Sequence, residues 1–151
     1  MPRIDLPLDP RRRPVVEVQV AVPAALARAL TQSGQAVPQP LRLSGLIDTG
    51  ASRTCIDHHV RGLLRLRGFS TLVVSAPTAG TAAQARRHLY KANLHILHPS
   101  GDPQQHLARN AFTVVAVPLR HLGVDVLIGR DLLAGCRFLY DGQAGTLRLE
   151  Y

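Results

Sequence analysis

A short polar segment, residues 48–52 (DTGAS), follows directly on an apolar run at 41–47. Burying an aspartate at the end of such a run is costly unless its carboxylate is hydrogen-bonded or paired. Thr49 offers a hydroxyl group, and Gly50 lets backbone amides come close to the Asp48 carboxylate because glycine has no side chain. A carboxylate held in this way is suited to acid or base chemistry on water. The same residues are also explained by an Asx turn, in which the aspartate only caps its own loop.

A second segment, residues 126–133 (VLIGRDLL), follows far downstream; an apolar strand ends there at Gly129, and a short helix is predicted to begin at Arg130. Together the two segments resemble the retropepsins, the retroviral-type aspartic proteases, and more closely their single-domain bacterial relatives. In that family an Asp-Thr-Gly-Ala strand and an apolar-apolar-Gly-Arg segment occur in this order and at about this spacing. The resemblance covers residues 15–151.

The resemblance implies an all-β fold, a closed antiparallel β barrel of the retropepsin type with one short C-terminal helix and a flap hairpin over residues 73–94. It also implies an aspartic endopeptidase that needs no cofactor. One ionised carboxylate takes a proton from water while a protonated one polarises the scissile carbonyl, because two such close like charges share a proton. Since the sequence contains a single Asp-Thr-Gly, the resemblance implies a homodimer in which Asp48 faces Asp48 of a second copy.

The resemblance further implies a role for each matching residue. The catalytic set is Asp48 as the carboxylate, Thr49 bonding across the dimer and Gly50 allowing close approach. The residues expected to contact a peptide substrate, including the flap tip, are Ala51, Ser52, Ala79, Gly80, Thr81 and Ile128. Gly129 would pack against the Asp48 loop, and Arg130 would brace that loop or the dimer. Ser52 departs from the pattern, because many viral members have there an acidic residue that contacts the substrate and pairs with the arginine.

Other readings of the sequence have weaker support. His58 and His59 are adjacent and point in different directions, so we expect no metal site. Ser52 lacks the Gly-x-Ser-x-Gly context of a serine nucleophile. A second hypothesis is a catalytically silent retropepsin-like dimer that holds an extended peptide by strand addition without cutting it. A nucleic-acid-binding barrel is a distant third.

Many short strands separated by turn residues, with little helix, indicate an all-β protein. Strands are predicted at residues 15–22, 41–47, 70–75, 88–97, 112–117, 124–129, 138–140 and 146–151. Short helical segments are predicted at residues 24–30, 56–66 and 130–134. Residues 1–14 hold four prolines and four arginines, so we expect an extended arm without a regular strand, followed by one protease-like domain over 15–151. The alternating residues 146–151 are expected to join an intersubunit sheet.

The composition narrows the classes of partner. The chain has 151 residues, of which 46% are hydrophobic and 19% charged, which suffices for one core. Its net charge is +8, and all but one of its 18 basic residues are arginine. Because the arginines are mostly scattered and only 4% of residues are aromatic, we attribute the charge to a GC-rich genome and expect no nucleic-acid partner. Without a long apolar run or a secretory signal, we expect no membrane association and a cytoplasmic protein, with Cys55 and Cys136 as half-buried thiols.

Overall fold

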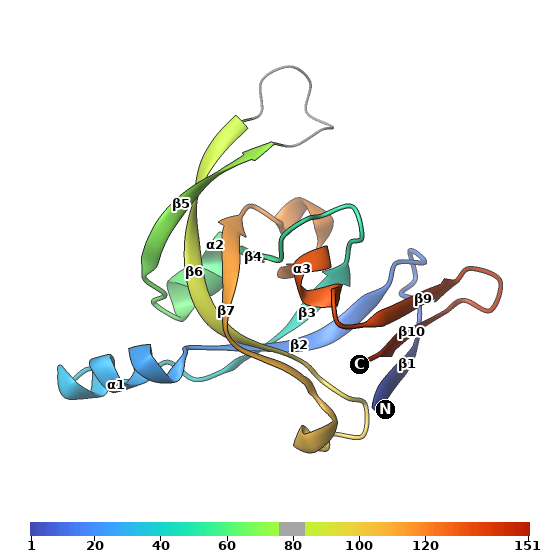
Figure 1. Ribbon diagram of the computed structural model, residues 1–151, viewed down its shortest axis with the longest axis horizontal. Coiled ribbons are helices and arrows are strands. Elements are labelled where there is room, and N and C mark those ends of the chain that lie inside the picture. The colour runs from blue at the N-terminus through green and yellow to red at the C-terminus, as the bar shows by residue number, and fades with distance from the viewer. Residues whose placement is uncertain (76–83) are drawn as a thin grey trace.

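The computed structural model describes residues 1–75 and 84–151, and Figure 1 shows its arrangement. Its strands are β1 (Arg3–Pro7), β2 (Val15–Ala21), β3 (Leu41–Ile47), β4 (Cys55–Asp57), β5 (Gly68–Ser75), β6 (Gln84–Ile96), β7 (Leu107–Val117), β8 (Val126–Ile128), β9 (Arg137–Asp141) and β10 (Thr146–Glu150). Its helices are α1 (Ala24–Gln32), α2 (His58–Leu63) and α3 (Arg130–Leu133), with the 3₁₀ turns η2 (Pro103–Gln105) and η3 (Arg120–Leu122).

A closed six-stranded barrel forms the body of the molecule. Its strands follow the order β2-β3-β8-β4-β7-β6, and β6 pairs with β2 to close it. Alternation along β2 sends Val16, Val18 and Val20 into the core, where at most 2% of each is exposed. The predicted closed barrel is confirmed, but it is mixed rather than antiparallel throughout, because β3–β8 and β4–β7 pair in parallel. The β3–β8 pairing matters most: Ile47 lies opposite Ile128, so the strands leading into the two sequence segments end side by side.

The first fourteen residues do not form an arm without regular structure, and that prediction was wrong. Residues 3–7 form β1, which pairs antiparallel with β10 and places Ile4 opposite Leu149. Both side chains are fully buried. The prolines were misleading because Pro2 precedes β1 and Pro7 is its last residue. An edge strand tolerates a missing amide donor at such positions. The apolar Ile4 carries the segment into the core.

The C-terminal hairpin is confirmed, but its surroundings differ from the prediction. A separate three-stranded sheet has the order β1-β10-β9, so β10 is the central strand. Residues 146–150 therefore use both of their hydrogen-bonding sides within the chain. They therefore offer no free side to a second copy, because β1 and β9 pair along both sides of β10, and their part in an intersubunit sheet stays a prediction.

The helices lie outside the barrel (Figure 1). Helix α1 confirms the helical segment predicted at 24–30. Helix α2 confirms only the middle of the segment predicted at 56–66, because residues 55–57 form β4. Asp57 caps α2 as its position suggested, since its carboxylate accepts a hydrogen bond from the His59 amide. Among the described residues, no helix combines the length and the apolar character needed to cross a membrane. Strands β5 and β6 pair antiparallel, but the predicted flap tip at residues 79–81 lies outside the described residues.

Candidate active site

Asp48 stands at the end of β3, half-buried, in a tight loop. Its amide donates to the Ile128 carbonyl at 2.9 Å, and its carbonyl accepts from the Ala51 amide at 3.1 Å. The carboxylate Oδ1 accepts a hydrogen bond from the Gly50 amide at 2.8 Å, which is the Asx-turn contact. A Cβ at Gly50 would lie 3.1 Å from that oxygen, so glycine allows this close approach. Among the described residues no donor bonds the second carboxylate oxygen, which leaves it available for chemistry.

Arg130 connects the Asp48 loop to α3. Its amide donates to the Ala51 carbonyl at 2.9 Å, and its guanidinium donates to the Thr49 carbonyl at 3.0 Å. These two contacts brace the loop from one side, where the sequence led us to expect an arginine that supports it. Ser52, in the same loop, is exposed. Because a serine stands where many viral members have an acidic residue, the Arg130 guanidinium bonds a backbone carbonyl and not a carboxylate.

Gly129 supports the same loop by leaving no room for a side chain. A Cβ at this position would lie 2.5 Å from the Arg53 carbonyl carbon and 2.9 Å from the Thr54 amide nitrogen. Two backbone segments therefore touch at Gly129, and any larger residue would push them apart. This placement agrees with the predicted packing of Gly129 against the Asp48 loop.

Thr54 and Asp131 hold together the two backbone segments that touch at Gly129. Neither residue was predicted from the sequence. Thr54 is fully buried; its hydroxyl donates to Asp131 Oδ1 at 2.7 Å, and its amide donates to Asp131 Oδ2 at 3.0 Å. The Thr54 hydroxyl oxygen also accepts from the Gly129 amide at 3.1 Å. One signal was available: Asp131 lies in the first turn of a short helix, where an acidic residue is favoured and able to accept hydrogen bonds.

Cys55 lies beside the junction but is a poor nucleophile. Burial, with the nearby charges of Asp131 and Asp48, raises the pKa of its thiol to about 11. At neutral pH the group therefore stays protonated. Cys55 and Cys136 are both free and partly buried, as predicted.

The structure places the expected substrate-binding residues unevenly. Ala51 is half-buried and Ser52 is exposed, both within the Asp48 loop. Ile128 was wrongly assigned to this set, because its side chain is fully buried in the hydrophobic core and cannot touch a substrate. Strand alternation turns the half-buried Leu127 to the other face of β8. Residues 79–81 lie outside the described residues.

A second polar cluster lies near the start of α2, apart from the Asp48 loop. The buried Asp57 carboxylate accepts from the amides of His59, at 3.0 Å, and Leu119, at 2.7 Å, and it contacts the His59 ring at 2.6 Å. Burial opposes its charge, but these hydrogen bonds outweigh burial and hold the pKa of Asp57 well below its usual range. The other ring nitrogen of His59 lies 3.4 Å from Asp125. Within the described residues, no group of three or more His, Cys, Asp or Glu side chains is arranged to hold a metal ion.

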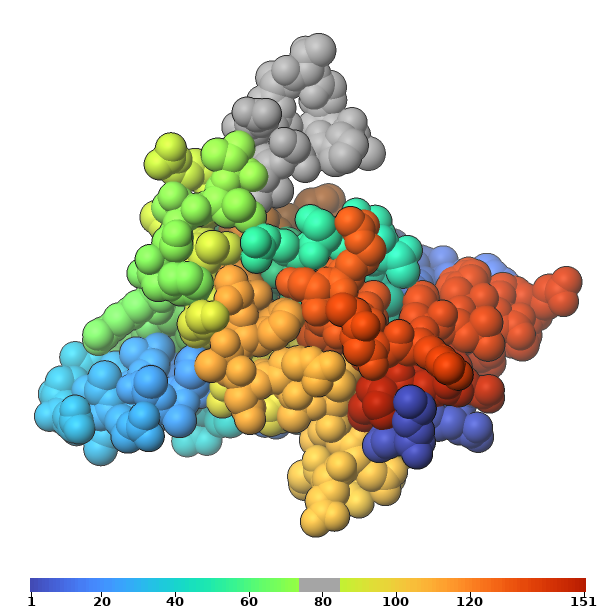
Figure 2. Space-filling model, viewed as in Figure 1, coloured from blue at the N-terminus to red at the C-terminus, as the bar shows by residue number. Residues whose placement is uncertain are grey.

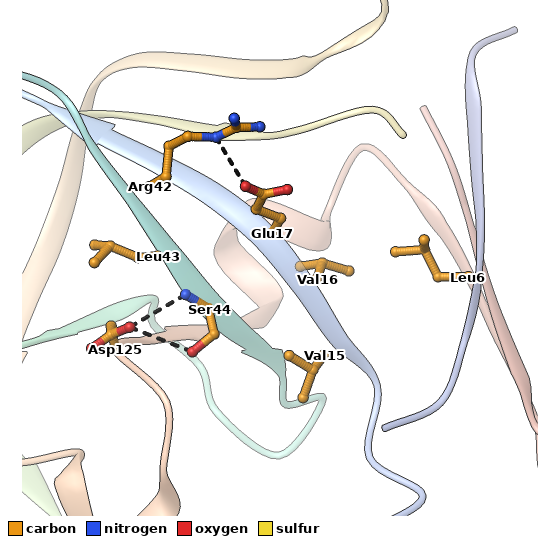
Figure 3. A pocket seen from close by; sticks show the side chains of 8 residues that line it. All are labelled: Leu6, Val15, Val16, Glu17, Arg42, Leu43, Ser44 and Asp125. Atoms are coloured by element: carbon orange, nitrogen blue, oxygen red, sulfur yellow. Dashed lines mark hydrogen bonds and ion pairs between the residues drawn. The ribbon is translucent and has the colours of Figure 1, made fainter. Parts of the chain in front are cut away.

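A hollow of about 480 Å³ lies between β1 and the strands β2 and β3 (Figure 3). On its wall, Glu17 and Arg42 form an exposed ion pair at 2.9 Å. Asp125 accepts long hydrogen bonds from the amide and the hydroxyl of Ser44. Leu6 and Val16 line its apolar wall. None of the predicted site residues lines this hollow, so it is separate from the Asp48 loop.

Comparison with known proteins identifies the fold. No protein-family model matches the sequence, and no curated protein matches it. The solved structure of a retropepsin-like aspartic protease from Rickettsia conorii matches with a TM-score of 0.57 and 14% identity, over 99% of this chain and 90% of that chain. The fold is retropepsin-like. This confirms the fold expected from the paired segments 48–52 and 126–133.

Two further solved structures match this retropepsin-like chain less closely. EIAV protease complexed with the inhibitor HBY-793 gives a TM-score of 0.41 and 17% identity, over 86% of this chain and 93% of that chain. The retroviral protease-like domain of Ddi1 from Leishmania major gives a TM-score of 0.41 and 15% identity, over 88% of this chain and 86% of that chain. At such low identity the similarity concerns the fold. The chemistry has to be argued from the loop that holds Asp48.

Proposed function

We propose that this retropepsin-like chain is an aspartic endopeptidase that hydrolyses peptide bonds with a pair of Asp48 carboxylates in a homodimer. The observation that carries the proposal is the Asp48 loop. It presents a half-buried carboxylate with one oxygen bonded by the Gly50 amide, and it does so where two parallel strands of the barrel end. The bracing by Arg130 keeps that carboxylate in one place.

The proposed chemistry needs two such carboxylates around one water. The ionised Asp48 accepts a proton from the water, whose oxygen attacks the peptide carbonyl carbon, while the protonated Asp48 of the second copy donates to the carbonyl oxygen. The C–N bond of the resulting tetrahedral intermediate then breaks as the first Asp48 gives its proton to the leaving amine nitrogen and the carbonyl re-forms, returning the second proton to the pair. The two carboxyl groups share one proton because they cannot both ionise at contact distance. A chain with a single Asp-Thr-Gly reaches this arrangement only by meeting a second copy. Thr49 is exposed in one chain and is proposed to bond across that dimer.

The proposed substrate is an extended peptide with apolar residues on both sides of the cleaved bond. Ala51 and Leu127 are half-buried at the end of the barrel that carries Asp48, and both are apolar. The exposed Ser52 brings no negative charge to this end of the barrel. A preference for charged residues at both positions would contradict this specificity without touching the proposed mechanism.

The test is cleavage of a diverse peptide library at about pH 5, where a shared-proton pair of carboxylates is active. Asp48→Asn is the informative variant, because its amide oxygen can still accept the Gly50 hydrogen bond while the ionisable group is gone. Asp102→Asn is a matched control in the distant 3₁₀ turn η2, where Asp102 caps the Gln104 amide. We expect cleavage by the wild type and by Asp102→Asn, and a loss of at least about a hundredfold in Asp48→Asn.

Two results would reject the proposal. Equal cleavage by the wild type and Asp48→Asn would assign the activity to another group or to a contaminant. No cleavage by either, with peptides bound and a dimer present in sedimentation, would favour the peptide-binding module. The replacement of the usual acidic residue by Ser52, which leaves the Arg130 guanidinium on the Thr49 carbonyl, is the observation that keeps that module as the second candidate.

A further inference from the structure

No acidic residue occurs between Asp57 and Asp102. This stretch, residues 58–101, contains six of the 18 basic residues and carries +6 of the net charge of +8. The remaining residues hold twelve basic and all ten acidic residues, so their charges nearly balance. A genomic preference for arginine adds basic residues, but it does not remove acidic ones from one part of the chain. We call residues 58–101 the basic region; it includes α2, β5 and β6, and its charges are Arg61, Arg65, Arg67, Arg86, Arg87 and Lys91.

The charges of the basic region are not neutralised within one chain. None of the six belongs to an ion pair among the described residues, and the sequence of residues 76–83 contains no acidic residue. Arg61 lies over the ring of Tyr90, 5.6 Å from its centroid, and Lys91 lies 5.2 Å from the centroid of the Phe69 ring. These contacts leave the positive charge in place, because an aromatic ring carries no net charge. The basic region therefore keeps its charge for a partner outside the chain.

One face of the β5–β6 hairpin places this charge next to apolar surface. Val73 lies opposite Arg86, Thr71 lies opposite His88, and all four residues are exposed. Val73 is 52% exposed, and Phe69, near the start of β5, is 54% exposed. A partner that suits this surface combines negative charge with apolar side chains.

Strand β5 (Gly68–Ser75) is the last strand of its sheet. Within the described residues it pairs with β6 alone, and it lies at the outer border of the molecule, drawn in green (Figure 1; Figure 2). Its eight residues, GFSTLVVS, include neither a charged residue nor a proline. Natural proteins usually place such residues on an edge strand, because its free amide and carbonyl groups pair readily with another strand. The edge of β5 is therefore open to an added strand.

We propose that the edge of β5 binds an extended, acidic segment of another polypeptide, which joins the sheet as an additional strand. Main-chain hydrogen bonds to the free edge hold the segment. Its acidic side chains face Arg86 and the two exposed arginines directly before β5, Arg65 and Arg67, and its apolar side chains cover Val73. This proposal is independent of the proposed function, because no residue of the Asp48 loop lies on β5 or β6.

Two other anionic partners, nucleic acid and a lipid surface, fit the charge but not the edge. Neither has a row of amide and carbonyl groups spaced to match a β-strand. The uncharged edge and the surrounding arginines are explained together only by a polypeptide partner, and the other two serve as comparisons in the test.

The test uses a short synthetic peptide of alternating valine and glutamate, with fluorescence anisotropy at neutral pH and low salt as the readout. Mass spectrometry of the same samples checks that the peptide stays intact. The same peptide with lysine in place of glutamate should bind at least about tenfold more weakly, because the basic region repels it. The glutamate peptide with its central amides N-methylated should lose at least about tenfold as well, because strand addition uses those donors.

A pair of charge reversals locates the binding. Arg67→Glu combined with Arg86→Glu should weaken binding of the glutamate peptide at least about tenfold. Arg11→Glu combined with Arg28→Glu is the matched control, because both residues are exposed and lie outside the basic region, and the net charge changes equally. This control should keep most of the affinity. Hydrogen exchange of the backbone amides of residues 68–73 should slow when the peptide binds.

The proposal is overturned if the glutamate peptide does not bind, if the lysine or the N-methylated peptide binds equally well, or if both double variants lose affinity equally. Protection of the Asp48 loop in place of residues 68–73 would also overturn it, since the peptide would then bind at the candidate active site. Vesicles containing phosphatidylserine and a DNA duplex are measured beside the peptide. If either binds the wild type more tightly than the peptide does and loses affinity in Arg67→Glu with Arg86→Glu, the basic region serves that ligand and the proposal is rejected.

Discussion

Replacement of Gly129 by alanine tests whether the close contact between β8 and the segment after the Asp48 loop holds the site together. The backbone of Gly129 has a φ of −91°, which alanine adopts without strain. The added Cβ alone therefore causes the effect. It would lie 2.5 Å from the Arg53 carbonyl carbon, 2.7 Å from its oxygen and 2.9 Å from the Thr54 amide nitrogen. All three are backbone atoms, so no side chain can turn aside to relieve the contact.

The expected cost has two parts. Overpacking of a close-packed interior costs about 1–3 kcal/mol. Moving the segments apart also weakens the 3.1 Å hydrogen bond from the Gly129 amide to Thr54, a net contribution of about 1 kcal/mol. We therefore expect Gly129→Ala to lose about 3 kcal/mol of unfolding free energy. For a chain of this size that corresponds to a fall of about 6–12 °C in Tm.

Urea unfolding followed by circular dichroism measures this loss, and Gly62→Ala is the matched control. Gly62 lies in α2, and a Cβ there would meet nothing within 4 Å. The control should gain up to about 1 kcal/mol, because alanine favours helix over glycine. If Gly129→Ala loses less than about 0.5 kcal/mol, the backbone contact is not under the constraint that we infer. Close packing at Gly129 would then not be what holds the segment after the Asp48 loop in place.

Three further perturbations have expected results. Thr54→Val should cost about 1–3 kcal/mol of unfolding free energy by removing the hydroxyl that joins Asp131 to Gly129, while Thr54→Ser should keep most of it; equal losses would contradict this. Because the pKa of Asp57 is lowered in the fold, its ionised carboxylate stabilises the fold above about pH 4, and this contribution disappears as the pH falls. Asp57→Asn should therefore cost about 2 kcal/mol of unfolding free energy at pH 7 and flatten the acid side of a plot of urea stability against pH. An unchanged plot would contradict this. Iodoacetamide should label Cys55 at pH 8 roughly a hundredfold more slowly in the folded than in the urea-unfolded chain, by mass spectrometry, because its pKa is raised to about 11; similar rates would refute the raised pKa.

Features that depend on local pattern could be predicted from the sequence. Alternating β-branched residues predicted β2, and Asp141 with Gly142 predicted the turn of the C-terminal hairpin. The resemblance carried by the Asp-Thr-Gly and Ile-Gly-Arg segments implied that Arg130 would brace the Asp48 loop or the dimer, and Arg130 contacts this loop. The strand and the turn need only the residues that carry them and the ordinary rules of local structure, whereas the contact of Arg130 was expected from the resemblance.

Features that depend on distant partners could not be predicted in the same way. Strand β1 was missed because its stability comes from burial of Ile4 against the C-terminal strand β10. The residues around Ile4, which include two prolines, give no local sign of this distant contact. Ile128 was assigned to a pocket through the family resemblance. Its burial could not be foreseen, because both faces of a short apolar strand look alike in sequence. Thr54 was missed because its partner, Asp131, lies on another element.

The Asp48 loop is shaped by hydrogen bonds within its own chain, whereas the proposed function needs a second carboxylate from another copy. The Gly50 amide, the Arg130 guanidinium and the Ile128 carbonyl all hold the loop by hydrogen bonds within one chain. If the proposed dimer forms, we therefore expect the loop to hold its geometry beforehand, so that association only brings the second carboxylate near. In that case dilution should lower the share of chains that cleave peptide without changing the rate of each assembled dimer. A rate per assembled dimer that changed with the total concentration would instead show that the partner shapes the loop itself.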